Sequence, residues 1–272
     1  MGQIIAFSGK KQSGKNTLCN FLHGYQLKSF GLIESFDLTS TGELIITTNI
    51  KEENGRVTKG QGALDVTRID IEFAIWAMDN IWPFAKHYAF ATALKELAIG
   101  LFDMNRDLVY GTDEQKNGLT QYKWEDMPVK VKGKSGFMTG REFIQYFGTE
   151  LCRKIYPNIW TDRTMKDIQA EDSNLAIISD ARFVNEVEAV QAAGGKVIRL
   201  TRSIGEDHHE SELALDGYKG FDAVIDTQNL NIEESCQELI KIIEGWDWFN
   251  DKVQVQPFRP VRDMRTTVSI KK

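Results

Sequence analysis

The amino terminus of this 272-residue chain places a glycine-bounded loop between an apolar run and a helical pattern. The loop spans Gly9–Lys15, residues 4–7 are the apolar run, and residues 17–22 have helical character. Strand, glycine loop and helix in this order are typical of a phosphate-binding loop, whose backbone N–H groups surround an anion at the positive end of a helix dipole. We therefore expect Lys15 to reach the β- and γ-phosphates of a nucleotide. The alternative is a glycine-rich turn with a solvated lysine.

The residue after this lysine departs from the usual phosphate-loop pattern. Serine or threonine usually stands there and its hydroxyl holds Mg²⁺, but this chain has Asn16, followed by Thr17. The Asn16 amide oxygen or the Thr17 hydroxyl could take that place, and the sequence leaves both open. The loop residues Lys11, Ser13 and Gly14 are expected to hold phosphate in either case.

Composition narrows the class of protein. Hydrophobic residues make up 42% of the chain, which is enough for a sizeable core, and the net charge is −6. This charge argues against a general nucleic-acid binder, so an anionic ligand has to meet a local group of basic residues. The three scattered cysteines indicate a reduced protein. The sequence suggests neither a signal peptide nor a membrane span, and we expect a cytoplasmic location.

Buried strands alternate with helices along most of the sequence. Strands are predicted at residues 3–8, 86–91, 175–179, 196–201 and 221–226. Helices are predicted at residues 15–24, 92–102, 141–155, 159–169, 183–193 and 231–244. Such alternation predicts an α/β fold in which helices flank a parallel sheet of five strands.

Two inserts interrupt this alternation. Residues 33–82 are predicted to be β-rich, with strands at 43–48 and 69–73 and a hairpin turn at Asn54-Gly55. Residues 119–139 form a second, polar insert. We therefore expect one domain over residues 1–245, including both inserts, and a carboxyl-terminal tail over 246–272, whose tryptophans could pack back on the body or contact a partner.

An acidic residue follows one of the predicted strands. Asp180 comes directly after the apolar residues 175–179, and Arg182 follows two positions later. Parallel sheets bind ligands at the carboxyl ends of their strands, where Asp180 could hold Mg²⁺ directly or through water. The structural alternative is that Asp180 caps the helix predicted over 183–193.

The helix predicted over 141–155 combines an apolar stripe with a polar one. The polar stripe carries Arg141, Gln145, Thr149 and Arg153, and Gly148 would let a neighbour or a ligand approach. Arginine suits bidentate phosphate contacts, and a glutamine amide can read a base edge. The alternative is a solvated amphipathic face.

A polar stretch follows Arg202 and extends from 203 to 220, so a lid carrying Arg202 is one interpretation. The stretch contains the adjacent histidines His208 and His209. Neighbours in sequence rarely share one ion and no third ligand is evident, so the sequence does not favour a metal site there.

Taken together, these motifs resemble those of the bacteriophage deoxynucleoside monophosphate kinases. The resemblance covers about residues 1–18, 86–117 and 139–244, and the 33–82 insert has no recognised counterpart. It is carried by Ser8–Thr17, Phe90–Lys95, Gly111-Thr112 with Lys116, Arg141–Glu150 with Arg153 and Trp160, Asp180–Glu186, and His209–Glu212 with Asp226–Asn229.

The resemblance implies a P-loop kinase fold and transfer of the ATP γ-phosphoryl group to a deoxynucleoside 5′-monophosphate. It implies that ATP is bound by Lys11, Ser13, Gly14, Lys15, Asn16, Thr17 and Asn229, with residues 227–229 against adenine. It implies that the acceptor monophosphate is bound by Lys95, Arg141, Gln145, Trp160, Asp180, Arg182 and Glu186. Catalytic roles fall to Lys15, Arg153, Asp180 and Arg202. Mg²⁺ would be held by Asn16, Thr17 and Asp180.

Three other classes share part of this pattern. A P-loop GTPase needs Asp-x-x-Gly and Asn/Thr-Lys-x-Asp motifs, and neither occurs. A kinase of another small metabolite, such as dephospho-coenzyme A, and a non-catalytic nucleotide sensor remain open. The sequence does not fix the accepted bases or the oligomeric state, so a homodimer also stays open. A phage-encoded enzyme would work in the host cytoplasm.

Overall fold

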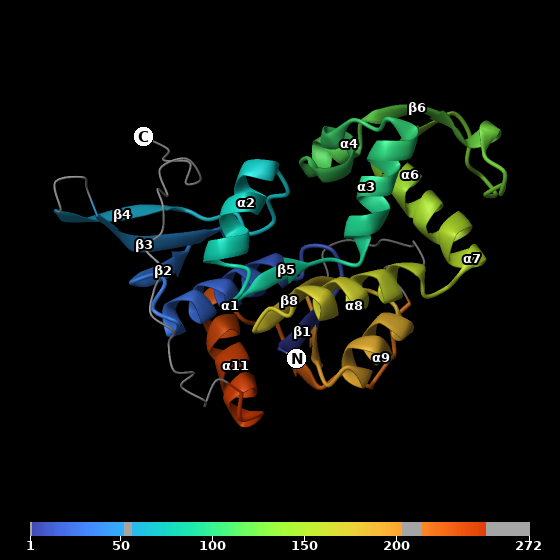
Figure 1. Ribbon diagram of the computed structural model, residues 1–272. Coiled ribbons are helices and arrows are strands. Elements are labelled where there is room, and N and C mark those ends of the chain that lie inside the picture. The colour runs from blue at the N-terminus through green and yellow to red at the C-terminus, as the bar shows by residue number, and fades with distance from the viewer. Residues whose placement is uncertain (1, 52–55, 203–213, 249–272) are drawn as a thin grey trace.

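The computed structural model describes residues 2–51, 56–202 and 214–248 (Figure 1). The strands are β1 (Gln3–Ser8), β2 (Ser35–Leu38), β3 (Leu44–Lys51), β4 (Val57–Ala63), β5 (Lys86–Tyr88), β6 (Leu119–Lys123), β7 (Phe137–Thr139), β8 (Leu175–Ala181), β9 (Lys196–Leu200) and β10 (Ala223–Ile225). The α-helices are α1 (Lys15–Ser29), α2 (Ile71–Asn80), α3 (Ala91–Phe102), α4 (Arg106–Tyr110), α5 (Asp113–Lys116), α6 (Gly140–Gln145), α7 (Arg153–Ile155), α8 (Ile159–Glu171), α9 (Val184–Ala192) and α11 (Ile232–Gly245). A short 3₁₀ turn spans Trp124–Asp126, and a π-helical segment spans Tyr146–Cys152.

The centre of the molecule is a five-stranded parallel sheet in the order β10-β9-β1-β8-β5. Successive residues of β1 serve opposite faces, as the pleat requires. Ile5 and Phe7 pack with α1 and α11, whereas Ile4 and Ala6 pack with α8 and α9. The sheet is thus covered by helices on both sides, which confirms the predicted α/β fold and its five strands.

A helical unit stands beyond the carboxyl ends of the central strands. It combines α3, α4, α6 and the π-helical segment, and residues 119–139 add a two-stranded antiparallel sheet of β6 and β7 (Figure 1). Its own apolar cluster includes Phe143, Tyr146, Phe147 and Trp160. The unit therefore has an apolar core separate from that of the sheet, and residues of α3 and α6 line the same cleft as the phosphate loop.

The first insert forms a three-stranded antiparallel sheet in the order β2-β3-β4, followed by α2. The prediction of a strand at 69–73 is wrong, because helix α2 begins there. Asp70 caps this helix by accepting a hydrogen bond from the Phe73 N–H at 3.0 Å. The predicted turn at Asn54-Gly55 lies outside the described residues. The insert shares its apolar cluster with Leu27 of α1, so it packs directly against the central unit.

The described end of the chain returns to the central unit. Trp246 and Trp248 pack against the cluster formed by the sheet, α1 and α11, and their ring centroids are 5.5 Å apart. The remainder of the predicted tail, from residue 249, lies outside the described residues. Among the helices that the structure describes, none combines the length and the apolar character that crossing a membrane requires.

Candidate active site

The phosphate loop connects β1 to α1 at the carboxyl edge of the sheet. Gly9 approaches the Ser13 side chain so closely that a Cβ atom on Gly9 would lie 2.4 Å from Ser13 Oγ, and Gly14 has a φ of +98°. The Lys15 ammonium bends back over the loop and donates to the carbonyls of Gly9 and Lys10, both at 2.7 Å. These contacts give the loop the closed geometry expected of an anion-binding site.

The surroundings of Lys15 disfavour the charged form of its ammonium group. Burial, followed by the nearby guanidinium of Arg182, lowers the pKa of Lys15 to about 7, although the carboxylate of Asp180 acts in the opposite direction. An anionic phosphate beside this ammonium would favour its charged form. The loop therefore holds a cation that gains stability when an anion binds.

The two residues after Lys15 differ in their surroundings. Asn16 is exposed, whereas Thr17 is half-buried and lies against Gly42 of the first insert. Both line a cleft of about 1610 Å³ that also contains Lys11, Ser13 and Gly14. The loop residues predicted to bind ATP are therefore together on one side of this cleft.

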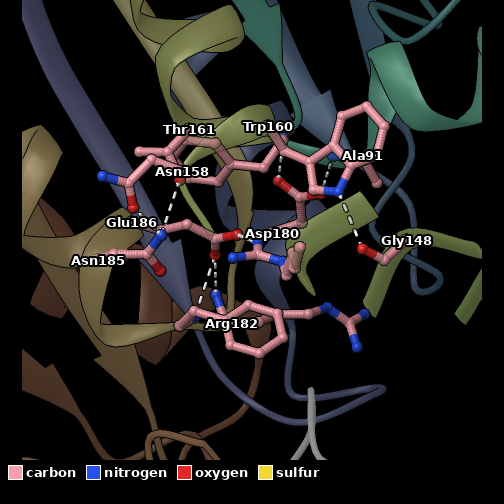
Figure 2. A network of polar contacts seen from close by, with 12 residues as sticks. Ala91, Gly148, Asn158, Trp160, Thr161, Asp180, Arg182, Asn185 and Glu186 are labelled. Carbon is pink, nitrogen blue, oxygen red and sulfur yellow. Dashed lines mark hydrogen bonds and ion pairs between the residues drawn. The ribbon is translucent and has the colours of Figure 1, made fainter. Parts of the chain in front are cut away.

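Asp180 lies at the carboxyl end of β8, between the phosphate loop and the helical unit. Its two carboxylate oxygens accept hydrogen bonds from the backbone N–H groups of Phe90 and Ala91, at 2.7 and 3.0 Å (Figure 2). Asp180 therefore caps the start of α3, and the cap anticipated for the helix at 183–193 is supplied by another residue. Each carboxylate oxygen retains capacity for one more contact on the cleft side.

Glu186 supplies that other cap. Its carboxylate accepts from the backbone N–H groups of Arg182 at 2.7 Å and Phe183 at 3.1 Å, and it forms an ion pair with Arg153. Glu186 is 2% exposed, and burial raises the pKa of its carboxyl group against the opposing effect of Arg153. The Arg153 guanidinium also lies 3.8 Å from the centre of the Phe183 ring. Arg153 and Glu186, both predicted site residues, thus line the cleft, and they do so as a buried ion pair that supports the fold.

The helical unit contributes basic side chains to the opposite side of the same cleft. Lys95, Arg141 and Gln145 line it together with Arg182 from the sheet side. Burial lowers the pKa of Lys95 to about 8, and the Lys95 ammonium lies 4.7 Å from the centre of the Tyr110 ring. This grouping supplies the local basic cluster that an acidic chain needs in order to bind an anion.

A carboxylate that the sequence did not single out joins the two sides. Asp113, at the start of α5, pairs with Lys11 of the phosphate loop at 2.7 Å and with Arg141 of α6 at 2.6 Å. These two cations hold the pKa of Asp113 below its ordinary value, Lys11 having the larger effect. The only sequence signal was the adjacent Gly111-Thr112, where Thr112 caps α5.

Trp160 lies in the core of the helical unit. It is 5% exposed and its indole N–H donates to the Gly148 carbonyl at 3.3 Å (Figure 2). Gly148 belongs to the π-helical segment, and a Cβ atom there would lie 2.5 Å from a methyl group of Leu94. The predicted approach to Gly148 is therefore made by a neighbouring side chain, and Trp160 borders the cleft mainly as a packing residue.

Arg202 and Asn229 lie at the loop predicted to contact adenine. The Arg202 guanidinium donates to the carbonyls of Thr227 at 2.7 Å and Leu230 at 3.0 Å, while Asn229 donates to Asp226 at 2.6 Å. Arg202 and Thr227 line the cleft. The His209–Glu212 motif lies outside the described residues. Arg202 therefore organises the 227–230 loop in this structure.

Comparison with known proteins agrees with this geometry. The family model described as "Deoxynucleotide monophosphate kinase" matches residues 3–239. The chain belongs to the deoxynucleotide monophosphate kinase family. A protein of Acanthamoeba polyphaga mimivirus, whose provisional name is deoxynucleotide monophosphate kinase, is 28% identical over 176 residues, which cover 60% of this chain and 84% of that protein. Family membership identifies the chain as a kinase and decides against the GTPase, the metabolite kinase and the nucleotide sensor considered above.

Proposed function

We propose that this kinase transfers the γ-phosphoryl group of ATP to a deoxynucleoside 5′-monophosphate and releases ADP and a deoxynucleoside diphosphate. The observation that carries the proposal is the cleft itself. Its volume of about 1610 Å³ exceeds the roughly 300–1000 Å³ typical of a pocket for one ligand. A phosphate loop lines one side and a separate basic cluster lines the other, which suits two nucleotides with facing phosphates.

The donor nucleotide is assigned to the phosphate loop. Lys11, Ser13, Gly14 and Thr17 would surround its phosphates, and the ammonium of Lys15 would neutralise charge on the β–γ bridge. The 227–230 loop, held by Arg202, would lie against adenine. Placing Arg202 there gives it a role in shaping the nucleotide site rather than in contacting the transferred group.

The acceptor is assigned to the cations on the opposite side. Lys95, Arg141 and Arg182 would bind its monophosphate, and Gln145 would lie near its base. The attacking phosphate oxygen is already anionic, so the reaction requires no strong base. Alignment of the two phosphates and stabilisation of the transferred charge then account for catalysis.

Mg²⁺ is expected to accompany the donor nucleotide. The described residues contain no group of three or more His, Cys, Asp or Glu side chains that could hold a metal alone, so the ion would depend on nucleotide oxygens and water. Thr17 and Asp180 offer a hydroxyl and a carboxylate at the cleft, while Asn16 is more exposed. Bound Mg²⁺ would neutralise charge on the β- and γ-oxygens.

The test is a coupled assay of ADP release, with ATP and a panel of deoxynucleoside and ribonucleoside monophosphates. We expect turnover with at least one deoxynucleoside monophosphate. Arg141→Ala should raise KM for that monophosphate about tenfold or more and leave KM for ATP within twofold, since one charged contact is lost on the acceptor side. Lys241→Ala, which removes an exposed cation of α11, is the control. Binding of ATP without turnover of any monophosphate would contradict the proposal.

A further inference from the structure

The first insert sends a tight turn to the phosphate loop. The turn, Thr39–Glu43, connects β2 to β3 and is closed by hydrogen bonds from the Gly42 N–H to the Thr39 carbonyl at 2.9 Å and from the Glu43 N–H to Thr39 Oγ1 at 3.0 Å. Gly42 is buried and has a φ of +82°, a region that L side chains rarely adopt. The turn is therefore a defined structure.

This turn contacts the first two turns of α1. A Cβ atom on Gly42 would lie 2.2 Å from Thr17 Oγ1, and the nearest atoms it would meet all belong to Thr17. One helical turn further, the Asn20 amide donates to the Gly42 carbonyl at 2.8 Å. Thr17 and Asn20 share one face of α1, as their i, i+3 spacing requires. Gly42 thus touches the threonine hydroxyl and is held in place by Asn20.

The rest of the insert fixes this turn along α1. The Phe36 ring of β2 packs against Gly24 of α1, where an added Cβ atom would lie 2.4 Å from the ring. Leu44 of β3 packs with Leu27 of α1. Figure 1 shows β2 and β3 beside α1. Because three successive regions of the helix contact the insert, the turn cannot shift without disturbing the shared core.

Two residues of the turn that carry hydroxyl groups line the cleft, and the Thr41 hydroxyl also hydrogen-bonds to Thr39 Oγ1 at 2.8 Å. Ser40 and Thr41 are exposed, and both line the cleft that contains Lys15 and Thr17. Hydroxyl groups donate readily to phosphate oxygens. The insert therefore contributes part of the wall beside the phosphate loop.

We propose that the Thr39–Glu43 turn is part of the nucleotide site, with Gly42 and Asn20 acting as positioning residues for the Thr17 hydroxyl and with Ser40 and Thr41 facing the phosphates of the donor nucleotide. This inference rests on the proposed function, because it concerns the same donor nucleotide. It assigns a role to a segment for which the family motifs provided none.

Calorimetric titration with ADP in the presence of Mg²⁺ tests the positioning. Gly42→Ala should weaken ADP affinity on the order of tenfold or more, because the added carbon would displace Thr17 and the loss of one hydrogen bond to a charged phosphate costs about that much. Asn20→Ala should weaken it about threefold, as loss of one hydrogen bond does. In the coupled assay both variants should raise KM for ATP more than KM for the monophosphate.

The chain provides matched controls for each variant. Gly31 also has a positive φ, +70°, but a Cβ atom there would meet nothing within 4 Å. Gly31→Ala therefore introduces similar backbone strain and should leave ADP affinity within twofold. Ser29 donates to the Tyr25 carbonyl at 2.8 Å near the far end of α1, so Ser29→Ala is the control for Asn20→Ala.

A double-mutant cycle decides whether Gly42 acts through Thr17. In a Thr17→Ala background, Gly42→Ala should weaken ADP binding clearly less than it does in the wild-type chain, since Thr17 Oγ1 and Cγ2 are gone and only the Cβ atom at 2.9 Å remains. An undiminished further loss, or equal effects of Gly42→Ala and Gly31→Ala in the wild-type chain, would overturn the inference while the kinase function stands. Failure of the wild-type protein to bind ADP would instead overturn the proposed function. If Gly42→Ala does not fold, Asn20→Ala against Ser29→Ala decides.

Discussion

The two sides of the cleft hold their cations in different ways. On the side that we assign to the donor nucleotide, Lys15 donates to two carbonyl oxygens of its own loop. On the side that we assign to the acceptor, Arg141 pairs with the carboxylate of Asp113, and Arg153, which also lines the cleft, pairs with that of Glu186. Carbonyl dipoles stabilise a cation less than a carboxylate does, so an incoming phosphate stabilises the charge of Lys15 most. Each arginine already has a carboxylate partner, which a phosphate would have to displace or share.

The two arginine pairs themselves differ in burial. The Asp113 side chain is 47% exposed, but that of Glu186 is 2% exposed. Water can take the place of a partner at Asp113 but cannot do so at Glu186. Arg141 is therefore available to a substrate, while Arg153 is committed to the fold.

Replacement of Lys15 should produce the largest change. Lys15→Met removes the ammonium that we propose stabilises the transferred charge, and it should lower kcat by on the order of 10²–10³-fold, as loss of one transition-state donor does. Steady-state kinetics at saturating ATP measures it. An unchanged kcat would show that catalysis does not depend on this cation, and the proposed difference between the two sides of the cleft would then be wrong.

Replacement of Arg153 should act on stability. Arg153→Ala leaves the Glu186 carboxylate buried and unpaired, which costs about 3 kcal/mol of unfolding free energy. Burial raises the pKa of Glu186 to about 7, and loss of Arg153 would raise it further. The cost should therefore grow as the pH rises above about 7, where only the wild-type carboxyl group ionises in the folded protein. Denaturant unfolding at several pH values measures it. Loss of kcat with normal stability would make Arg153 a catalytic residue instead.

The central fold was largely readable from the sequence, because βα alternation and apolar runs fix the order of elements. The prediction of a strand at 69–73 was wrong because Ile69, Ile71 and Phe73 alternate with acidic residues as in a strand, whereas Asp70 caps α2 through a local hydrogen bond from the Phe73 N–H. The π-helical segment contains Gly148, which packs closely against Leu94 of α3, and local periodicity predicts neither the segment nor this contact.

In the candidate site, too, some residues could be predicted from local sequence and others could not. Lys15, Asp180 and Arg182, which line one cleft in the structure, were singled out in the sequence because a motif and a strand end coincide at each. Asp113 and the Thr39–Glu43 turn were missed because each joins segments far apart in the chain: Asp113 pairs with Lys11, and Gly42 contacts Thr17. Such long-range contacts produce no periodic pattern in the local sequence. The partner of a charged residue is set by topology, and for that reason the sequence could not separate Arg141 from Arg153.

The pH dependence of ADP binding should reflect Lys15 alone on the donor side. In the free loop the pKa of Lys15 is about 7, and a bound phosphate raises it. Above pH 7 binding must therefore take up a proton, and affinity should fall by up to about tenfold per pH unit. Titrations between pH 7.5 and 9, in buffers of different ionisation enthalpy, measure the uptake. Lys15→Met should abolish it, and uptake that persists in this variant would assign it to another group.

The smallest expected effect concerns Asp113, where the acceptor side is open to exchange. If its carboxylate occupies the place that a substrate phosphate takes, Asp113→Asn should lower KM for the monophosphate by about two- to fivefold, because exposed ion pairs contribute roughly 1 kcal/mol or less. The same weakness means that the free energy of unfolding should change little. Glu238→Gln, which removes the carboxylate partner of Lys241 outside the lining of the cleft, is the control. A higher KM would mean that Asp113 holds Lys11 and Arg141 in their working positions, and the acceptor side would then be as preformed as the donor side.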